Sequence, residues 1–292
     1  MNKKMAVIAA GWHYPGLFYE QMINQKVPAG WDVDYFINSH RDPSFVVDEI
    51  KPRLDRLGDS LLEVMDKRFY KHIPTVNELE KMGWSYSLQP NIIGDWGNAN
   101  QWLERYDYND YDVLLITHDD NWIVGQNLFT DILGENKEKI YKNIWMEGRP
   151  KEPEITNFNK DWLVISNAVV NGRAAVRGSF EFFKKNVIEG MGGNFDLDRI
   201  THTREGKFDN PDDHMALNDW NNHVYGFMNY AYHSGIYNDH VRFLSDAYRV
   251  SEYCIEGERG FLSKMNTPQA GVYIAGVQKL IDNGLINEDM LK

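Results

Sequence analysis

The sequence is short of cysteine, of basic clusters and of long apolar runs. Cys254 is the only cysteine among 292 residues, which excludes an intrachain disulfide. No run of five or more lysine and arginine residues occurs and the formal net charge is -12, so an extended nucleic-acid surface is disfavoured as the main partner. No apolar run reaches the length of a membrane span, and the one at residues 5–10 is too short for an export signal. These absences lead us to expect a soluble cytoplasmic protein.

What the sequence does contain is enough apolar material for a large folded core. Hydrophobic residues make up 42% of the 292 positions and aromatic residues 13%, which argues against disorder. Residues 5–10 and 32–37 are apolar runs typical of buried strands, and residues 17–25 between them fit a helix. This β-α-β start predicts a parallel strand pair joined by a right-handed crossover.

Strands and helices are expected to alternate along the rest of the chain. Further strands are predicted at residues 84–88, 113–116, 162–170 and 241–250. Helices are predicted at residues 44–57, 61–70, 75–83, 98–106, 127–133, 179–188, from about 218 onward, and at 271–283. Two of them begin with capping boxes, one at Ser60 with Glu63 and one at Thr75 with Glu78. Residues 134–160 are polar and contain two prolines, so we expect a surface excursion that is a mobile loop near the site.

The stretch at residues 111–121 joins a buried strand to an acidic turn. Residues 113–116 are apolar and mostly branched, which fits a strand covered on both faces, and Asp119 and Asp120 follow almost at once. Adjacent carboxylates repel each other, and a cation or a positively charged partner would compensate this repulsion. In open α/β sheets the ligand crevice lies outside the carboxyl ends of the strands. The stretch therefore predicts a ligand site, with a plain Asp-Asp-Asn turn as the alternative.

The residue types at this turn suit a hard divalent cation. Asp119 and Asp120 offer oxygen ligands for Mg²⁺ or Mn²⁺, which usually take further ligands from water and substrate phosphates. His118 lies beside them, but one histidine next to two aspartates lacks the spacing of a zinc site. His214 could complete the metal sphere from the other side of the cleft, and a solvated or capping histidine is the alternative there.

Other candidates for site residues are a carboxylate, a glycine and three tryptophans. Asn218 can cap a helix, which puts Asp219 in the first turn. The helix dipole stabilises a carboxylate there, and the same position could hold a general base at the rim of a cleft, so both roles stay open. Gly11 would permit close approach of the backbone to a ligand. Expected loop positions at strand ends make Trp12, Trp96 and Trp122 candidates for stacking on a base or sugar.

Four segments carry a family resemblance by their order and spacing. They are MAVIAAGWHYPG at the N-terminus, GNANQWLERY just before YDVLLITHDDN, RGSFEFFKKNVIEGMGGNFD, and LNDW. Together they resemble the GT-A glycosyltransferases, most closely the broad family 2 type, over roughly residues 5–250. The resemblance implies an α/β fold with a GT-A, Rossmann-like, mixed and mainly parallel sheet flanked by helices. It also implies one domain over residues 1–292, with a nucleotide-sugar-binding half at 1–125 and an acceptor-binding half at 126–292.

The function implied by this resemblance is metal-dependent sugar transfer from a nucleoside-diphosphate sugar to an acceptor hydroxyl, with inversion. Asp119 and Asp120 would hold Mn²⁺ or Mg²⁺ and the diphosphate, and Asp219 would be the catalytic base. Near the nucleoside, the resemblance places Gly11, Trp12, His13, the segment 38–40 beginning at Asn38, and Asp95. The acceptor could be a glycan, a protein, a small molecule or a modified nucleic-acid base.

The sequence departs from the family pattern at three points. The acidic motif is His-Asp-Asp-Asn, which leaves open which pair replaces the usual Asp-x-Asp. Asn218 stands where the family has Glu, and the second strand ends in Asn-Ser-His without the expected Asp, so the nucleotide stays open.

Two other functions are alternatives to sugar transfer. A nucleotidyltransferase would show a Gly-rich phosphate loop with a basic residue, and residues 11–13 are a poor example. A non-catalytic nucleotide- or sugar-binding protein would bind ligand without turnover.

Overall fold

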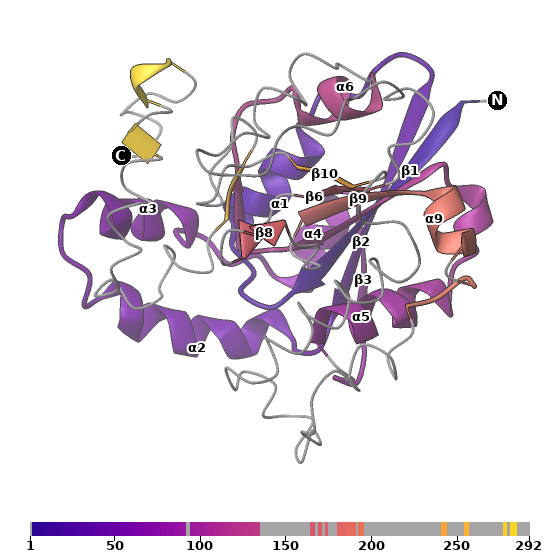
Figure 1. The fold of residues 1–292 in the computed structure, drawn as a ribbon. Coiled ribbons are helices and arrows are strands. Elements are labelled where there is room, and N and C mark those ends of the chain that lie inside the picture. The colour runs from indigo at the N-terminus through magenta and orange to yellow at the C-terminus, as the bar shows by residue number, and fades with distance from the viewer. Residues whose placement is uncertain are drawn as a thin grey trace.

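A computed structural model describes the N-terminal part of the chain almost continuously and short pieces of the rest. The described residues are 2–91, 94–134, 164–166, 169–170, 173–174, 180–190, 192–195, 241–243, 254–256, 277–278 and 281–284. Helices and strands alternate through them, as expected (Figure 1). No helix among these residues is both long enough and apolar enough to cross a bilayer.

The elements have the following bounds. The strands are β1 (Lys3–Gly11), β2 (Trp31–Ser39), β3 (Trp84–Leu88), β4 (Val113–His118), β5 (Asn121–Ile123), β6 (Val164–Ser166), β7 (Val169–Val170), β8 (Arg173–Ala174), β9 (Phe180–Lys184), β10 (Val241–Phe243) and β11 (Cys254–Glu256). The helices are α1 (Gly16–Ile23), α2 (Pro43–Leu54), α3 (Leu61–Phe69), α4 (Val76–Lys81), α5 (Gly94–Leu103), η1 (Tyr108–Asp110), α6 (Leu128–Leu133) and α9 (Lys185–Gly190).

The main sheet is mixed and mainly parallel. Its strands lie in the order β10-β6-β9-β4-β1-β2-β3. β1 is parallel to β2 and β4, β3 is parallel to β2, and β10 is parallel to β6. Only β9 runs antiparallel to its neighbours β4 and β6 among these described strands. The expected fold class, an α/β fold with a mixed, mainly parallel sheet, is therefore confirmed.

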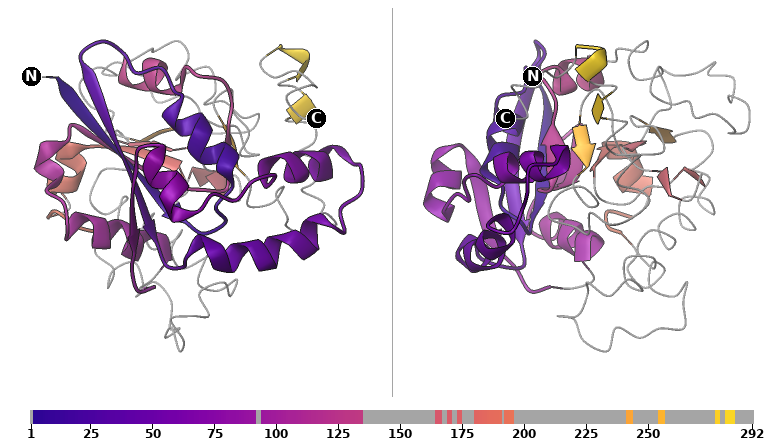
Figure 2. Two further views of the ribbon diagram at one scale, coloured as in Figure 1. Left: turned by 180° about the vertical axis from the view of Figure 1, so that it is seen from behind. Right: turned by 90° about the vertical axis from the view of Figure 1, so that its left-hand side faces the viewer.

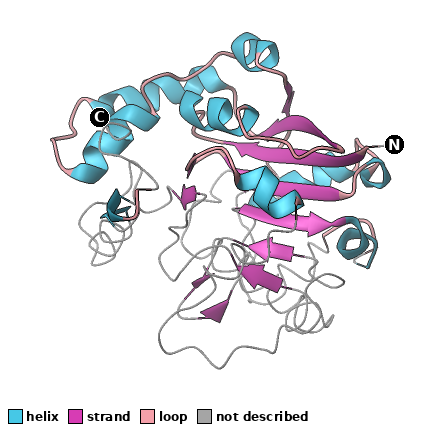
Figure 3. Cartoon of the chain, turned by 90° about the horizontal axis from the view of Figure 1, so that it is seen from above, coloured by secondary structure: helices cyan, strands magenta, loops and turns pink. Residues whose placement is uncertain are grey.

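Both faces of the sheet are covered by apolar side chains. Met5, Val7 and Ala9 of β1 belong to a core that α1, α2, α3 and α4 complete on one face. The residues between them in β1 point to the other face, where Trp102 of α5 contacts Phe36 of β2 at a ring-centroid distance of 5.3 Å. Figure 3 shows helices gathered mainly along one side of the strands. Covering on both faces explains why the parallel strands are continuous apolar runs in the sequence.

The chain between β2 and β3 forms three helices, and the first two, α2 and α3, follow the carboxyl end of β2. Asp42 caps α2 by accepting the Ser44 N–H at 2.9 Å, and Pro43 occupies the first helical position. The predicted capping box of α3 is present, because the Ser60 N–H donates to Glu63 at 3.1 Å. Figures 1 and 2 show α2 and α3 together at one side of the sheet. These helices bring side chains toward the ends of β1 and β2.

The prediction of a helix at residues 179–188 is wrong in its first half. Residues 180–184 form strand β9, and α9 begins only at Lys185. Phe180, Phe182 and Phe183 are all fully buried, because β9 lies between β4 and β6 and is covered on both faces. A short, continuous apolar run fits a two-sided buried strand as well as a buried helix, and periodicity alone does not separate them.

Candidate functional site

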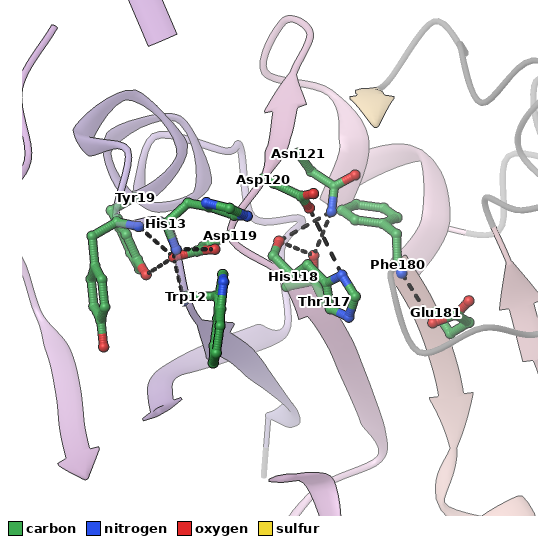
Figure 4. A network of polar contacts seen from close by, with 11 residues as sticks. Trp12, His13, Tyr19, Thr117, His118, Asp119, Asp120, Asn121, Phe180 and Glu181 are labelled. Carbon is green, nitrogen blue, oxygen red and sulfur yellow. Dashed lines mark hydrogen bonds and ion pairs between the residues drawn. The ribbon is translucent and has the colours of Figure 1, made fainter. Parts of the chain in front are cut away.

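The candidate site lies where the order of the parallel strands reverses. β2 pairs with one edge of β1, and β4 pairs with the other edge. In open α/β sheets a ligand crevice forms outside the carboxyl ends of the strands at such a point. The residues 11–15 after β1 and the acidic turn after β4 meet here, as Figure 4 shows.

Asp119 is turned toward the loop that follows β1. Its Oδ2 accepts the backbone N–H groups of Trp12 at 2.9 Å, His13 at 3.0 Å and Tyr14 at 2.7 Å, and the hydroxyl of Tyr19 at 3.0 Å. The Asp119 side chain is fully buried. Burial and the negative charge of Asp119 raise the pKa of Tyr19, so its hydroxyl stays protonated and donates. Asp119 thus fills an anion-binding concavity made by three successive N–H groups (Figure 4).

The loop that Asp119 holds has a strained backbone. Tyr14 has a φ of 52°, a left-handed conformation that costs a residue with a side chain on the order of 1–3 kcal/mol. Its hydroxyl donates to the carbonyl of Arg41 at 2.8 Å, which fixes the ring beneath the loop. A Cβ on Gly11 would lie 2.7 Å from that hydroxyl and 2.9 Å from Cγ2 of Ile37. The glycine therefore makes room for protein side chains, and its predicted contact with a ligand stays a prediction.

Arg41 joins the loop after β1 to the loop after β2. Its guanidinium lies over the Trp12 ring at 4.0 Å, and its Nε donates to the Trp12 carbonyl at 2.7 Å. The Arg41 side chain also pairs with Glu49 of α2 at 2.8 Å. From β2, the Ser39 hydroxyl donates to the carbonyl of Gly11 at 2.5 Å. These contacts hold Trp12 and Arg41 side by side at the ends of β1 and β2.

Asp120 points away from Asp119, toward the end of β4. Its Oδ1 lies 3.8 Å from Nδ1 of His118, and its side chain is 9% exposed. The amide of Asn121 donates to the His118 carbonyl at 3.1 Å and to the Thr117 hydroxyl at 3.3 Å, which fixes the turn (Figure 4). Asp119 and Asp120 are therefore adjacent in the sequence, but their carboxylates have different surroundings in the structure.

The C-terminal end of helix α3 packs against the loop that follows β1. The ring of Tyr70, at the end of α3, meets the His13 ring edge-on with 6.2 Å between centroids. Burial raises the pKa of Tyr70, and the charge of Asp120 raises it further. Within the part of the chain that the structure describes, the buried Tyr70 hydroxyl has no hydrogen-bond partner. Tyr70 therefore brings an unused donor close to Asp120.

His13 is held in its neutral form. Burial is the main cause and lowers its pKa to about 4; the negative charge of Asp119 opposes this shift, and the positive charge of Arg41 adds to it. His13 as a residue is partly exposed to solvent. Near neutral pH the His13 side chain accordingly adds no charge to the site and can still accept or donate one hydrogen bond.

The described residues supply a limited set of ligands for a metal ion. No group of three or more histidine, cysteine, aspartate or glutamate side chains converges in the described ranges. Mg²⁺ and Mn²⁺ need only one or two protein carboxylates when substrate phosphates and water complete the shell. Asp120 fits that requirement by its place at the end of β4. Asp119 is fully buried against the loop 12–14, where its Oδ2 accepts four protein donors, and its role as a cation ligand stays a prediction.

Two other residues expected near the nucleoside have different surroundings. The Asn38 amide donates to the Asn98 carbonyl at 2.8 Å, and its Oδ1 accepts from Arg105, so this buried side chain ties β2 to α5. Asp95 lies in the first turn of α5, which packs against β1 and β2. A nucleoside contact by Asn38 or by Asp95 stays a prediction.

The expectation for the tryptophans holds at one position of three. Trp12 lies in the loop after β1 and is partly exposed. Trp96 is fully buried in α5, where it packs against Phe195 at a centroid distance of 4.7 Å. Trp122 is 2% exposed in β5 and stacks on Phe69 at 5.8 Å. Both were expected in loops at strand ends, but each lies in a regular element and faces the core.

Several predicted features fall outside the described residues. His214 and Asp219 belong to the range 196–240, and the expected mobile loop belongs to 135–163. Arg41, Tyr19 and Tyr70 were not singled out from the sequence. Arg41 directly follows the predicted second strand, which was a usable signal, whereas nothing in the sequence connects Tyr19 or Tyr70 to the acidic turn.

Comparison with known proteins finds similarity only at the level of solved structures. No protein-family model matches the sequence. No curated protein matches it either. Three crystal structures of TarS from S. aureus, a GT-A glycosyltransferase, are similar to this chain at 11% sequence identity and a TM-score of 0.38.

The likeness to TarS extends over most of this chain and over part of TarS. Each match covers 86% of this chain. It covers 59% of the structure of TarS residues 1–349, alone or in complex with UDP, and 36% of the longer TarS structure. At this identity and TM-score the likeness gives no residue of this chain a role. The mixed, mainly parallel α/β sheet follows from the strand pairing of this chain alone.

Proposed function

We propose that this chain transfers a sugar from a nucleoside-diphosphate sugar to an acceptor hydroxyl. The observation that carries the proposal is the meeting of an ordered loop and a buried carboxylate at the switch point of the sheet. Asp119 orders the loop after β1, while Asp120 lies at the end of β4 beside His118. A crevice at this position is where open α/β sheets bind nucleotides.

The described residues around the loop after β1 offer groups for the base or sugar of such a donor and for its diphosphate. The indole of Trp12 is partly exposed and offers a surface for stacking. Arg41 lies against it and Arg53 is close enough to lower the pKa of His13 through its charge, so two cations are near the loop. The Tyr70 hydroxyl is a donor close to Asp120. Guanidinium and hydroxyl donors are the groups that bind diphosphate oxygens.

A divalent cation would complete this arrangement. Asp120 would hold Mn²⁺ or Mg²⁺, and His214 would contribute from the part of the chain that follows. When bound, the cation would offset the negative charge that develops on the departing nucleoside diphosphate. Arg41, which its contacts with Trp12 and Glu49 hold in place, would keep the diphosphate oriented.

Asp219 is our proposed base. The resemblance at LNDW assigns it the proton of the attacking hydroxyl, and attack on the face opposite the departing diphosphate inverts the anomeric centre in one displacement. The acceptor and the nucleotide remain open, since the second strand ends in Asn-Ser-His. The acceptor-binding half at residues 126–292 is part of the same proposal.

Binding of UDP, GDP, ADP and CDP with and without Mn²⁺ tests the proposal. A ligand present at 100 times its dissociation constant raises the free energy of unfolding by about 2.7 kcal/mol, which a thermal melt detects easily. We expect at least one diphosphate to stabilise the wild type, with a stronger effect when Mn²⁺ is present.

Asp120→Asn should lose the Mn²⁺-dependent part of this stabilisation and keep its melting temperature without ligand. The matched control is Asp48→Asn, since Asp48 is exposed on α2 away from the turn. The proposal fails if no diphosphate binds the wild type, or if Asp120→Asn responds to Mn²⁺ as the wild type does.

A further inference from the structure

The adjacent aspartates of the acidic turn are used in different ways. All four donors of Asp119 meet at its Oδ2, three of them backbone N–H groups of the loop 12–14, and the His13 N–H also reaches Oδ1 at 3.1 Å. The Asp119 N–H itself donates to the carbonyl of Ala10 at 3.3 Å, which fixes this residue to the end of β1. The Asp119 side chain is fully buried against this loop, whereas Asp120 keeps 6% exposure, so a cation could reach Asp119 only if the loop opened.

The loop depends on this carboxylate for its shape. Three successive N–H groups that point to one place normally bind an external anion, such as a phosphate. In this chain the anion is internal, and it compensates for the left-handed backbone of Tyr14. Without the Asp119 carboxylate the three N–H groups would lose the charged acceptor that holds them together, and the loop would be less firmly fixed.

We propose that Asp119 is a positioning residue that shapes the loop 12–14 for the donor, and that Asp120 alone of the two faces the cation. The part concerning the donor rests on the proposed function. The part concerning the loop does not, because it follows from the contacts of Asp119. Asp119 therefore acts on nucleotide binding through Trp12 and His13, and the affinity for the cation is independent of it.

Hydrogen exchange of the loop amides tests the anchoring without any ligand. Asp119→Asn replaces the charged acceptor by a neutral amide, whose oxygen binds the loop N–H groups more weakly, so exchange of residues 12–14 should accelerate at least about tenfold. Asp120→Asn is the matched control and should leave exchange there within about twofold. Tyr19→Phe removes one donor and keeps the ring packed against Phe18 and Trp84, so it should accelerate exchange less than Asp119→Asn and still fold.

The cation dependence of nucleotide binding tests the division of tasks. For whichever of UDP, GDP, ADP or CDP binds the wild type, the ratio of dissociation constants without and with Mn²⁺ is measured. Asp119→Asn and Tyr19→Phe should weaken binding in both conditions and leave the ratio within about threefold, whereas Asp120→Asn should bring the ratio close to one.

Two results would overturn the inference. One is unchanged exchange of residues 12–14 in both Asp119→Asn and Tyr19→Phe. The other is a ratio close to one in Asp119→Asn, as expected for a cation ligand. If the wild type binds none of the four diphosphates, the proposed function fails, and the exchange measurement still decides whether Asp119 anchors the loop.

Discussion

At the scale of single residues, the site depends on which way each side chain points. The sequence places Asp119 and Asp120 next to each other, and its acidic pair could be recognised without a structure. The different roles of Asp119 and Asp120 could not be recognised from the sequence, because they depend on contacts with a loop more than 100 positions away. Arg41 likewise gains its role from the Trp12 ring that it covers. Contacts between distant loops leave no local pattern in a sequence.

Removing the hydroxyl of Tyr70, and that of Tyr111 as a comparison, tests whether the Tyr70 hydroxyl contributes to stability. Tyr70→Phe should leave the free energy of unfolding unchanged or slightly higher, because a buried hydroxyl without a partner costs stability. Tyr111→Phe should lower it by about 0.5–1.5 kcal/mol, since the Tyr111 hydroxyl donates to Asp34 at 2.9 Å. Urea unfolding of both variants gives the comparison.

The same Tyr70→Phe protein should bind the nucleoside diphosphate roughly tenfold more weakly, which corresponds to about 1.4 kcal/mol for one hydrogen bond. Tyr111→Phe is the control here too, because Tyr111 lies at the other end of β4. A Tyr70→Phe protein that loses more than about 1 kcal/mol of stability and binds normally would show that the hydroxyl has a structural partner.

At the scale of elements, local rules predicted what local interactions determine. Both capping boxes were found where the sequence placed them, and the strands at residues 84–88 and 113–116 were read from their apolar residues. The failure at residues 180–184 has a clear cause. These residues form a strand because β4 and β6 lie on either side, and neither neighbour is adjacent in the chain.

The capping box of α4 gives a prediction about pH. Thr75 donates its N–H to Glu78 at 2.8 Å and its hydroxyl at 2.8 Å, and these bonds lower the pKa of Glu78. A lowered pKa means that the folded state favours the charged carboxylate. The contribution to stability is therefore present above the ordinary glutamate pKa and is lost as the pH falls through the lowered one.

Glu78→Gln should consequently melt below the wild type at pH 7, and the difference should shrink toward pH 3. Thr75→Ala, which removes the cap itself, should lower the free energy of unfolding by about 1 kcal/mol at neutral pH. Glu80→Gln on the exposed side of α4 is the control. A Glu78→Gln difference that grows on acidification would contradict this account of the helix start.

At the scale of the whole molecule, the sheet order positions the site. The β-α-β start and the apolar strands predicted a parallel arrangement, and the structure confirms it. The sequence could not give the place of β9, which decides how the described strands beyond β4 are joined to the sheet. The base and the second metal ligand that we propose lie at residues 196–240, outside the described ranges, so the role of Asp219 depends on the resemblance and that of His214 on its residue type.

The central claim is that the loops at the carboxyl ends of β1 and β4 bind the donor for sugar transfer with Asp219 as base. The direct measurement is release of nucleoside diphosphate from UDP- and GDP-sugars with Mn²⁺ by the wild type and by Asp219→Asn, together with donor affinity. Asp219→Asn keeps the shape and most of the capping ability of the side chain, and Asp212→Asn and Asp213→Asn are controls. We predict that turnover of Asp219→Asn falls by about 10²- to 10⁴-fold while donor affinity is largely kept. Turnover within a few-fold of the wild type, loss of activity in a control instead, or a wild type that releases no diphosphate would contradict the account.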